Sequence, residues 1–235
     1  MSDELVLPPR MTVLGEAMRP IWVKVNEQLD QHVSQTDVVI GMGEVVLQHL
    51  RSLQVDIPRL ADRINRLMGD VVTNEDASNA EVYRAVGRFE AFLDDLLAEY
   101  RSVRALNVHG DDVEARDLLA GVYRHTLVEI RDWLEDLVET LADPMAAVIR
   151  RGLPTTGHVE LTLTMKLTAA PQLEQLTRWA ERHAAALSGT GNSSSLPPVR
   201  KSGLGFWSMV GAAMLGWSLG EALFGDHDCR CDKDA

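Results

Sequence analysis

Apolar residues recur at every third or fourth position through most of residues 1–187, which is the spacing of one face of an α-helix. The first such face occupies residues 11–29 and the second residues 37–53. Pro58 suits the first turn of a third helix, because a proline there has no helical hydrogen bond to lose. Residues 73–80, TNEDASNA, have the composition of a turn. We therefore expect three helices before this turn.

Two longer apolar faces follow, in residues 82–103 and 123–141, and their steps alternate between four and three. This 3.5-residue period is typical of helices that pack as a coiled coil. Ser78 and Glu81 stand at the spacing of a capping box, in which each side chain accepts the free backbone N–H of the other residue. The break NVHGDD, residues 107–112, lies between the two faces. They predict a long antiparallel helical hairpin, which ends or kinks at Pro144.

Residues 158–168, HVELTLTMKLT, show a different period, in which apolar and polar residues alternate strictly. Alternation with a high threonine content predicts a β-strand with one buried face. Such a strand needs a partner for its backbone, either a weaker strand of this chain or the same segment of a second chain; a misread helix is the remaining interpretation. Pro171 then begins a last helix. Residues 1–187 are thus predicted to form a mainly α, multi-helix bundle with one amphipathic strand.

Residues 204–224 form an apolar run of 21 residues with one ionisable group, Glu221. As a helix this run measures about 31 Å, which matches the roughly 30 Å hydrocarbon core of a bilayer. Small residues recur at every fourth position and would let two such helices pack closely: Ser208, Ala212, Gly216 and Gly220. We expect a Gly-rich transmembrane helix, joined to the body by the flexible linker 188–203. The alternatives are a helix buried by protein and an amphipathic helix lying in the membrane interface.

The charges on either side of this run differ in sign. Arg200 and Lys201 precede it, whereas the tail, residues 225–235, contains four aspartates. Basic residues favour the cytoplasmic side of a membrane. The N-terminus has no secretory signal pattern. The prediction is therefore a membrane protein with a single-pass C-terminal anchor and a cytoplasmic body.

Composition narrows the classes of partner. The net charge is −12 and no long basic run occurs, which argues against a nucleic-acid partner, because phosphate binding needs clustered Lys and Arg. Cysteine is absent from the first 200 residues, so packing alone must hold the body together. A hydrophobic content of 46% is enough for a sizeable core.

The acidic tail holds the weak metal candidates His227, Cys229 and Cys231. Imidazole and thiolate are good zinc ligands, but a structural site needs four ligands held on separate elements. Disulfides between chains are an alternative if the tail faces an oxidising compartment, and two thiols without a role are the simplest interpretation.

Other patterns in the body are better explained by structure than by chemistry. VVIGMGEVV, residues 38–46, lacks the third glycine of a dinucleotide-binding loop. The acidic stripe of residues 129–143 lacks the Glu-x-x-His elements of di-iron bundles and is typical of a solvated face. Trp179 and His183 are one helical turn apart, where their rings can stack. We expect no catalytic site and no cofactor.

These patterns together predict a non-enzymatic, membrane-tethered helical interaction or scaffold protein that forms homo-oligomers and binds protein partners. Two alternatives remain open. The chain could be a pore-forming effector whose Gly-rich helix inserts on activation, or a soluble subunit whose last helix is buried by its partners.

Overall fold

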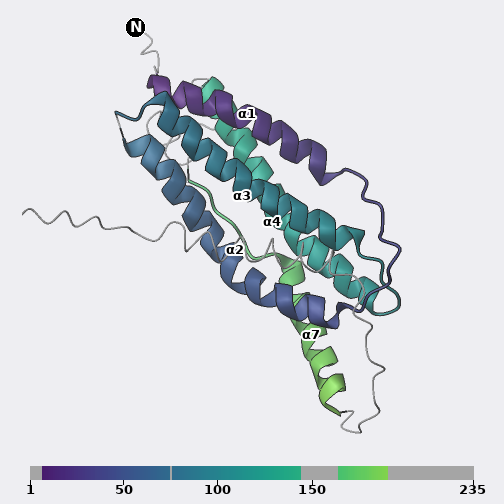
Figure 1. Ribbon diagram of the computed structural model, residues 1–235. Coiled ribbons are helices and arrows are strands. Elements are labelled where there is room, and N and C mark those ends of the chain that lie inside the picture. The colour runs from purple at the N-terminus through teal and green to yellow at the C-terminus, as the bar shows by residue number, and fades with distance from the viewer. Residues whose placement is uncertain (1–6, 75, 144–163, 190–235) are drawn as a thin grey trace, which may run out of the picture. The chain divides into compact units, whose positions relative to one another are not determined.

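The computed structural model describes residues 7–74, 76–143 and 164–189, which belong to a compact unit that runs from Met1 to Gly191. These residues form the helices α1 (Pro9–Leu29), α2 (Met42–Thr73), α3 (Asn79–Ala105), α4 (Asp112–Ala142) and α7 (Pro171–Gly189) (Figure 1). No strand occurs in this part of the chain, where the only β-pairing is an isolated bridge between Val39 and Asn107. The prediction of a mainly α, multi-helix bundle is confirmed.

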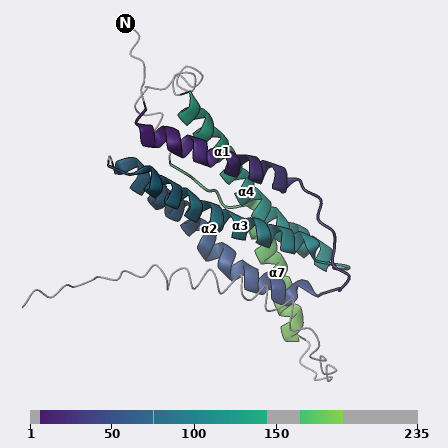
Figure 2. The same cartoon turned by 45° about the horizontal axis from the view of Figure 1, so that its top comes forward.

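Helix α4 occupies the middle of the bundle and packs against each of the other four helices that the structure describes. Helices α1 and α3 pack on α4 and on each other, while α7 packs on α4 and α2. Both views show the far end of α7, in green, extending past the first turns of α2 (Figures 1 and 2). The first two helices, although consecutive, make few contacts with each other: α1 packs on α3 and α4, and α2 packs on α3, α4 and α7.

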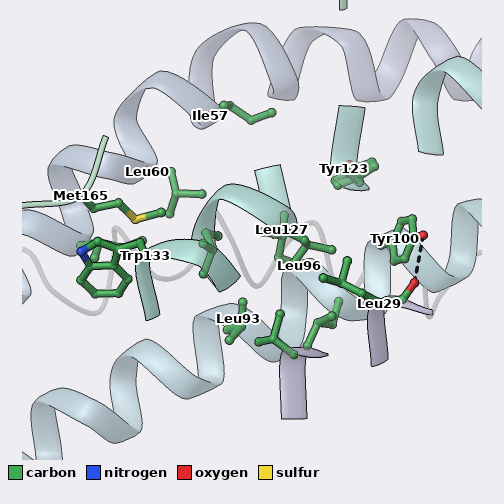
Figure 3. Close-up of a cluster of buried hydrophobic side chains, with 14 of the residues drawn as sticks. Leu29, Ile57, Leu60, Leu93, Leu96, Tyr100, Tyr123, Leu127, Trp133 and Met165 are labelled. Carbon is green, nitrogen blue, oxygen red and sulfur yellow. Dashed lines mark hydrogen bonds between the residues drawn. The ribbon is translucent and has the colours of Figure 1, made fainter. Parts of the chain in front are cut away.

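The core is built from the apolar faces that the helical periods predict. Every apolar position on the predicted faces of α1, α3 and α4 is buried, and several leucines have no exposed surface, among them Leu14, Leu93, Leu127 and Leu134 (Figure 3). The two helices of the predicted hairpin, α3 and α4, pack together along their 3.5-residue faces. Aliphatic residues provide most of this core, as the low aromatic content requires.

Helices α1 and α4 approach each other closely at Gly15. A Cβ atom placed on Gly15 would lie 2.8 Å from Cβ of Leu141, closer than real carbon contacts allow. Glycine is therefore needed at this position because its lack of a side chain lets the two backbones approach.

The predicted start of a new helix at Pro58 is wrong. Residues 42–73 form one continuous helix with Pro58 in its interior. Proline cannot donate a hydrogen bond to the carbonyl of Gln54, but both residues lie on the exposed side, where water can satisfy that carbonyl. Pro20 occupies the same kind of position in α1.

The hairpin begins as its sequence predicts. Ser78 and Glu81 form the complete capping box: Ser78 N–H donates to Glu81 Oε2 at 2.7 Å, and Glu81 N–H donates to Ser78 Oγ at 3.4 Å. The hydrogen bond from the Ser78 backbone, followed by that from its side chain, holds the pKa of Glu81 below its usual value. Gly110 has a φ of 61°, which suits glycine, in the turn before α4.

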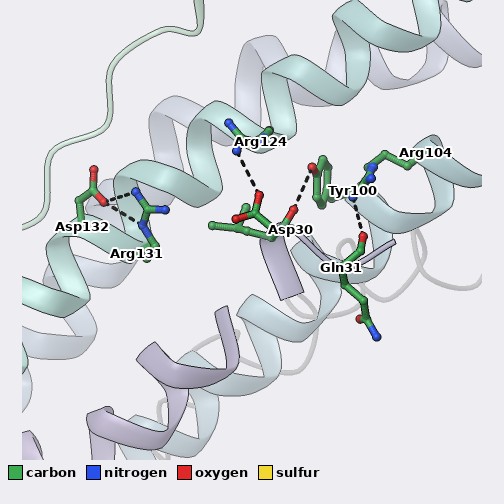
Figure 4. Close-up of polar contacts among 8 residues, drawn as sticks. Asp30, Gln31, Tyr100, Arg104, Arg124, Arg131 and Asp132 are labelled. Carbon is green, nitrogen blue, oxygen red and sulfur yellow. Dashed lines mark hydrogen bonds and ion pairs between the residues drawn. The ribbon is translucent and has the colours of Figure 1, made fainter. Parts of the chain in front are cut away.

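The connections at residues 30–41 and 106–111 lie at the same end of the bundle. Hydrogen bonds hold this end together. The N–H of Thr36 donates to the carbonyl of Ala105 at 2.8 Å, and that of Ile40 to the carbonyl of Asn107 at 3.0 Å. The N–H of Met42 donates to Oδ2 of Asp112 at 3.2 Å. Side chains of α3 and α4 also hold the end of α1 (Figure 4): Tyr100 Oη donates to Leu29 O, Arg104 to Gln31 O, and Arg124 pairs with Asp30.

The predicted strand at residues 158–168 is only partly within the described residues, which resume at Thr164. Residues 164–170 belong to no helix or strand. Their alternation is real, since Met165 is buried, Lys166 exposed and Leu167 half-buried. The side of this segment that carries Met165 is covered by helices α2 and α4 rather than by a neighbouring strand.

Candidate functional site

Few polar side chains lie inside the bundle, and His49, with 4% of its surface exposed, is the one buried histidine among the residues that the structure describes. It lies on α2, and its Nδ1 is 2.7 Å from Tyr123 Oη on α4, with the two rings edge to face. Because both groups can donate and accept, each satisfies the other. The pair therefore joins α2 to α4 without leaving a buried polar atom unpaired.

The acid–base properties of this pair follow from its burial. Desolvation lowers the pKa of His49 to about 4, so the imidazole is neutral at pH 7. Burial also raises the pKa of Tyr123 above its usual value, and the negative charges of Glu99 and Asp56 add to this effect. Burial, with a contribution from Asp95, raises the pKa of Glu99 too. The cluster favours neutral forms and is suited to holding helices together.

A second polar cluster lies between the helices and residues 164–189, which we call the arm. Here the side chain of Asn65, on α2, binds both backbone groups of one arm residue. Its Oδ1 accepts the N–H of Met165 at 2.7 Å, and its Nδ2 donates to the C=O of Met165 at 2.9 Å. This is the hydrogen bonding that a neighbouring strand would offer, supplied by one amide side chain.

The Met165 side chain itself is buried, with 1% of its surface exposed. In Figure 3 it points toward Leu60 of α2 and Trp133 of α4. An unbranched thioether adapts well to such a gap between two helices. The arm thus enters the space between α2 and α4, which we call the arm groove, with one apolar anchor and a bound backbone.

On the α4 side, Glu129 binds the arm three residues further on. Its carboxylate accepts the N–H of Thr168, at 3.0 Å to Oε2, and also the Thr168 hydroxyl. His125 Nε2 lies 3.1 Å from the same hydroxyl and 3.6 Å from Glu129 Oε1. A histidine, a carboxylate and a hydroxyl could suggest a nucleophile with its base. Here the carboxylate binds the hydroxyl and its own backbone N–H directly, an arrangement that anchors the segment.

Helix α7 continues the arm along the same groove. Leu176, Trp179 and Ala180 are buried, and Trp179 stacks on His183 with ring centroids 3.8 Å apart, which confirms the predicted contact. A Cβ placed on Gly121 of α4 would lie 2.9 Å from Cγ of Gln172, so the helix surface is shaped for this side chain. Gln172 Oε1 is buried without a hydrogen-bond partner.

A hollow of about 570 Å³ lies between α4 and α7, lined by Glu114, Gln175, Arg178, Glu181 and Arg182. Two carboxylates and two guanidinium groups balance its charge, and Arg178 already pairs with Glu174. The lining offers no nucleophile, so nothing in the hollow indicates a reaction.

The residues that the sequence singles out as sites lie outside the described residues: Ser208, Ala212, Gly216, Gly220, His227, Cys229 and Cys231. Of the acidic stripe, predicted to be a solvated face, Asp132 is exposed and pairs with Arg131 (Figure 4). Glu129 differs from that prediction, because the arm covers it partly. Sequence reasoning also missed His49 and Asn65.

Within the part of the chain that the structure describes, no group of His, Cys, Asp and Glu side chains could hold a metal ion. The helices in the same part include none that is long and apolar enough to cross a membrane. Comparison with protein-family models, curated proteins and solved structures gives no match for this chain. Its function must therefore be argued from its own residues.

Proposed function

We propose that this chain is a non-enzymatic helical interaction protein, in which residues 204–224 span a membrane and tether the bundle to it. The observation that carries the proposal is the apolar run itself, 21 residues with Glu221 as its single ionisable group. The small-residue stripe in this run supports self-association of the tethered chains, because it permits close helix packing in lipid.

The arrangement of the bundle is in keeping with a role in binding rather than catalysis. Its polar clusters satisfy one another: His49 with Tyr123, and Glu129 with Thr168. Catalytic groups, by contrast, must remain accessible to a substrate. Protein partners, including further copies of this chain, are therefore the proposed ligands.

Alkaline carbonate extraction of cell membranes tests the tether. The full chain should stay in the membrane pellet, whereas a chain that lacks residues 200–235 should move to the supernatant in a helical, folded state. Recovery of the full chain in the carbonate supernatant would refute the tether and favour a soluble subunit. Dye leakage from liposomes on addition of the purified chain would instead favour the pore-forming alternative.

The orientation has its own test, because both cysteines of the chain lie in the tail, at Cys229 and Cys231. A membrane-impermeant maleimide should label intact cells only if the tail lies outside. Labelling that requires lysis would contradict a cytoplasmic body.

Substitutions within the run test self-association. Gly216→Ile and Gly220→Ile place large side chains on the small-residue stripe and should weaken cross-linking between chains in membranes. Ala213→Ile is the matched control, since it makes a similar change off the stripe. Equal cross-linking in all three variants would contradict packing through the stripe.

A further inference from the structure

The arm groove recognises features that any copy of the arm provides. Asn65 binds the backbone N–H and C=O at Met165, and Glu129 binds the backbone N–H at Thr168. The apolar contribution comes from Met165, Leu167 and Ala170 and then from one face of α7. Because α7 packs mainly on α4 and α2, the arm and its groove form one separable interface.

The chain that leads to the arm is long enough to reach a second molecule. The arm enters the groove near Glu129, 14 residues before Asp143, which is a return of about 21 Å along α4. Residues 144–163 join Asp143 to Thr164, and a chain of that length can extend to about 70 Å. The connection therefore exceeds what the intramolecular path needs.

The docked arm also contains a buried polar atom without a hydrogen-bond partner. Gln172 Oε1 is buried without a partner, and such an acceptor weakens the docking of the segment that carries it. Outside its buried anchors, α7 presents exposed residues such as Glu174, Gln175 and Arg178. Undocking of the arm should therefore cost less free energy than separation of α1, α3 and α4.

We propose that the arm of one copy occupies the arm groove of a second copy, which gives dimers by arm exchange. The contacts are the same within a chain and between chains, so only the local concentrations decide between them. A connection of this length holds its own arm at an effective concentration on the order of millimolar. Exchange therefore requires chains gathered to a similar density, and in this respect it rests on the membrane tether of the proposed function.

Cross-linking between two marked chains tests the exchange. Two full-length chains with different tags are co-expressed, both with Cys229→Ser and Cys231→Ser. One carries His125→Cys in the groove and the other Thr168→Cys in the arm, at positions whose side chains lie 3.1 Å apart. A short bismaleimide should then link the two cysteines, so that one covalent dimer carries both tags.

A control pair uses Lys24→Cys in one chain and Asp94→Cys in the other. These side chains are 2.7 Å apart but join α1 to α3, away from the arm. Arm exchange leaves this contact within each chain, so no mixed dimer should form. A mixed dimer of equal yield from the control pair would show random collision and overturn the inference.

One substitution should act in opposite directions in the two chains. Met165→Asp in the groove chain undocks that chain's own arm and frees its groove, so the mixed dimer should increase several-fold. The same change in the arm chain removes the anchor that must dock, so the mixed dimer should disappear. Met165→Ala, a milder change, should shift the yields in the same two directions. An effect that does not depend on which chain carries the substitution would overturn arm exchange.

Failure of exchange and failure of the tether give different results. If the chains resist carbonate extraction but cross-link only within a chain, even when the groove chain carries Met165→Asp, exchange is wrong and the tether stands. If carbonate extracts the chains and the mixed dimer still forms at millimolar protein, the tether is wrong and exchange stands.

Discussion

The two sides of α4 are held by different kinds of interaction. Toward α1, Gly15 lets the backbones meet at Leu141, and the contact is mainly apolar, with the ion pair of Arg124 and Asp30 at one end. Toward the arm, a few apolar anchors such as Met165 and Trp179 are accompanied by side chains that bind backbone groups. One helix thus takes part in a continuous core on one side and in a recognition groove on the other.

The difference teaches how two parts of one bundle can differ in permanence. Apolar packing depends on many neighbours at once, so it is lost only when the whole core separates. The arm adds fewer apolar side chains to that core than α1, α3 or α4 does, so its departure disturbs the core less. We expect α1, α3 and α4 to open only in global unfolding and the arm to open locally.

The largest expected effect comes from Leu134→Ala, which removes a fully buried side chain on α4. The loss of transfer free energy and the remaining cavity should lower the free energy of unfolding by about 2–5 kcal/mol. Amide hydrogen exchange of the full chain should accelerate in α1, α3 and the arm alike. Leu47→Ala, at a position 44% exposed, is the control. Faster amide hydrogen exchange confined to α4 would contradict the proposed difference between the core and the arm.

The next effect is the pH dependence contributed by His49. Its pKa is lowered to about 4 in the folded state, so the unfolded state binds the proton more readily between pH 4 and 6.5. Stability is therefore complete above pH 6.5 and falls as the pH drops toward 4, by up to about 3 kcal/mol. Denaturation of the parent chain and of His49→Gln over this range measures the difference. If the free energy of unfolding of the two proteins changed with pH in parallel, the lowered pKa of His49 would be contradicted.

Asn65→Ala should have a smaller and local effect. Met165 loses both backbone hydrogen bonds to the amide, which is worth about 1–3 kcal/mol. Because these bonds hold the arm alone, amide hydrogen exchange should accelerate in residues 164–189. It should stay unchanged in α1 and α3. Asn107→Ala, in the connection at residues 106–111, is a matched control. Equal acceleration throughout the bundle would show that the arm and core open together.

The smallest expected effect concerns Lys24, which joins α1 to α3 through Asp94 and Glu90. The hydrogen bond that Lys24 donates to Asp94 is the main cause that raises the pKa of Lys24. Since both carboxylates are nearly half exposed, Lys24→Met should cost no more than about 1 kcal/mol, and added salt should remove the difference. A large loss that persists at high salt would mean that polar contacts also matter on the core side.

Much of the fold was predictable because helical periodicity reports burial directly. The apolar faces of residues 82–103 and 123–141 predict the hairpin, and Ser78 with Glu81 predicts where it begins. The sequence could not show whether Pro58 begins a helix or lies inside one, because proline is tolerated both in the first turn of a helix and on its exposed side. The sequence shows the residue type but not which neighbouring carbonyl is hydrated.

The arm groove was harder to predict. Alternation at residues 164–168 reports that side chains point to opposite faces, but it does not report what binds the backbone. A strand and a helix-bound extended segment therefore have the same pattern. Asn65 looks like an ordinary exposed residue of an amphipathic helix. His49 stands between Val46 and Leu53 on an apolar face, and that placement was the available signal for a buried polar pair.

The joined connections at one end of the bundle bear on the order of folding. The pairing of Val39 with Asn107 closes a loop of nearly seventy residues and cannot form early, because long loops are entropically costly to close. The hairpin of α3 and α4 requires only local closure, and it supplies the surface on which α1 and α2 must settle. The chain is therefore expected to fold from its middle outward, and α1 packs only after the later-synthesised α3 and α4 have formed.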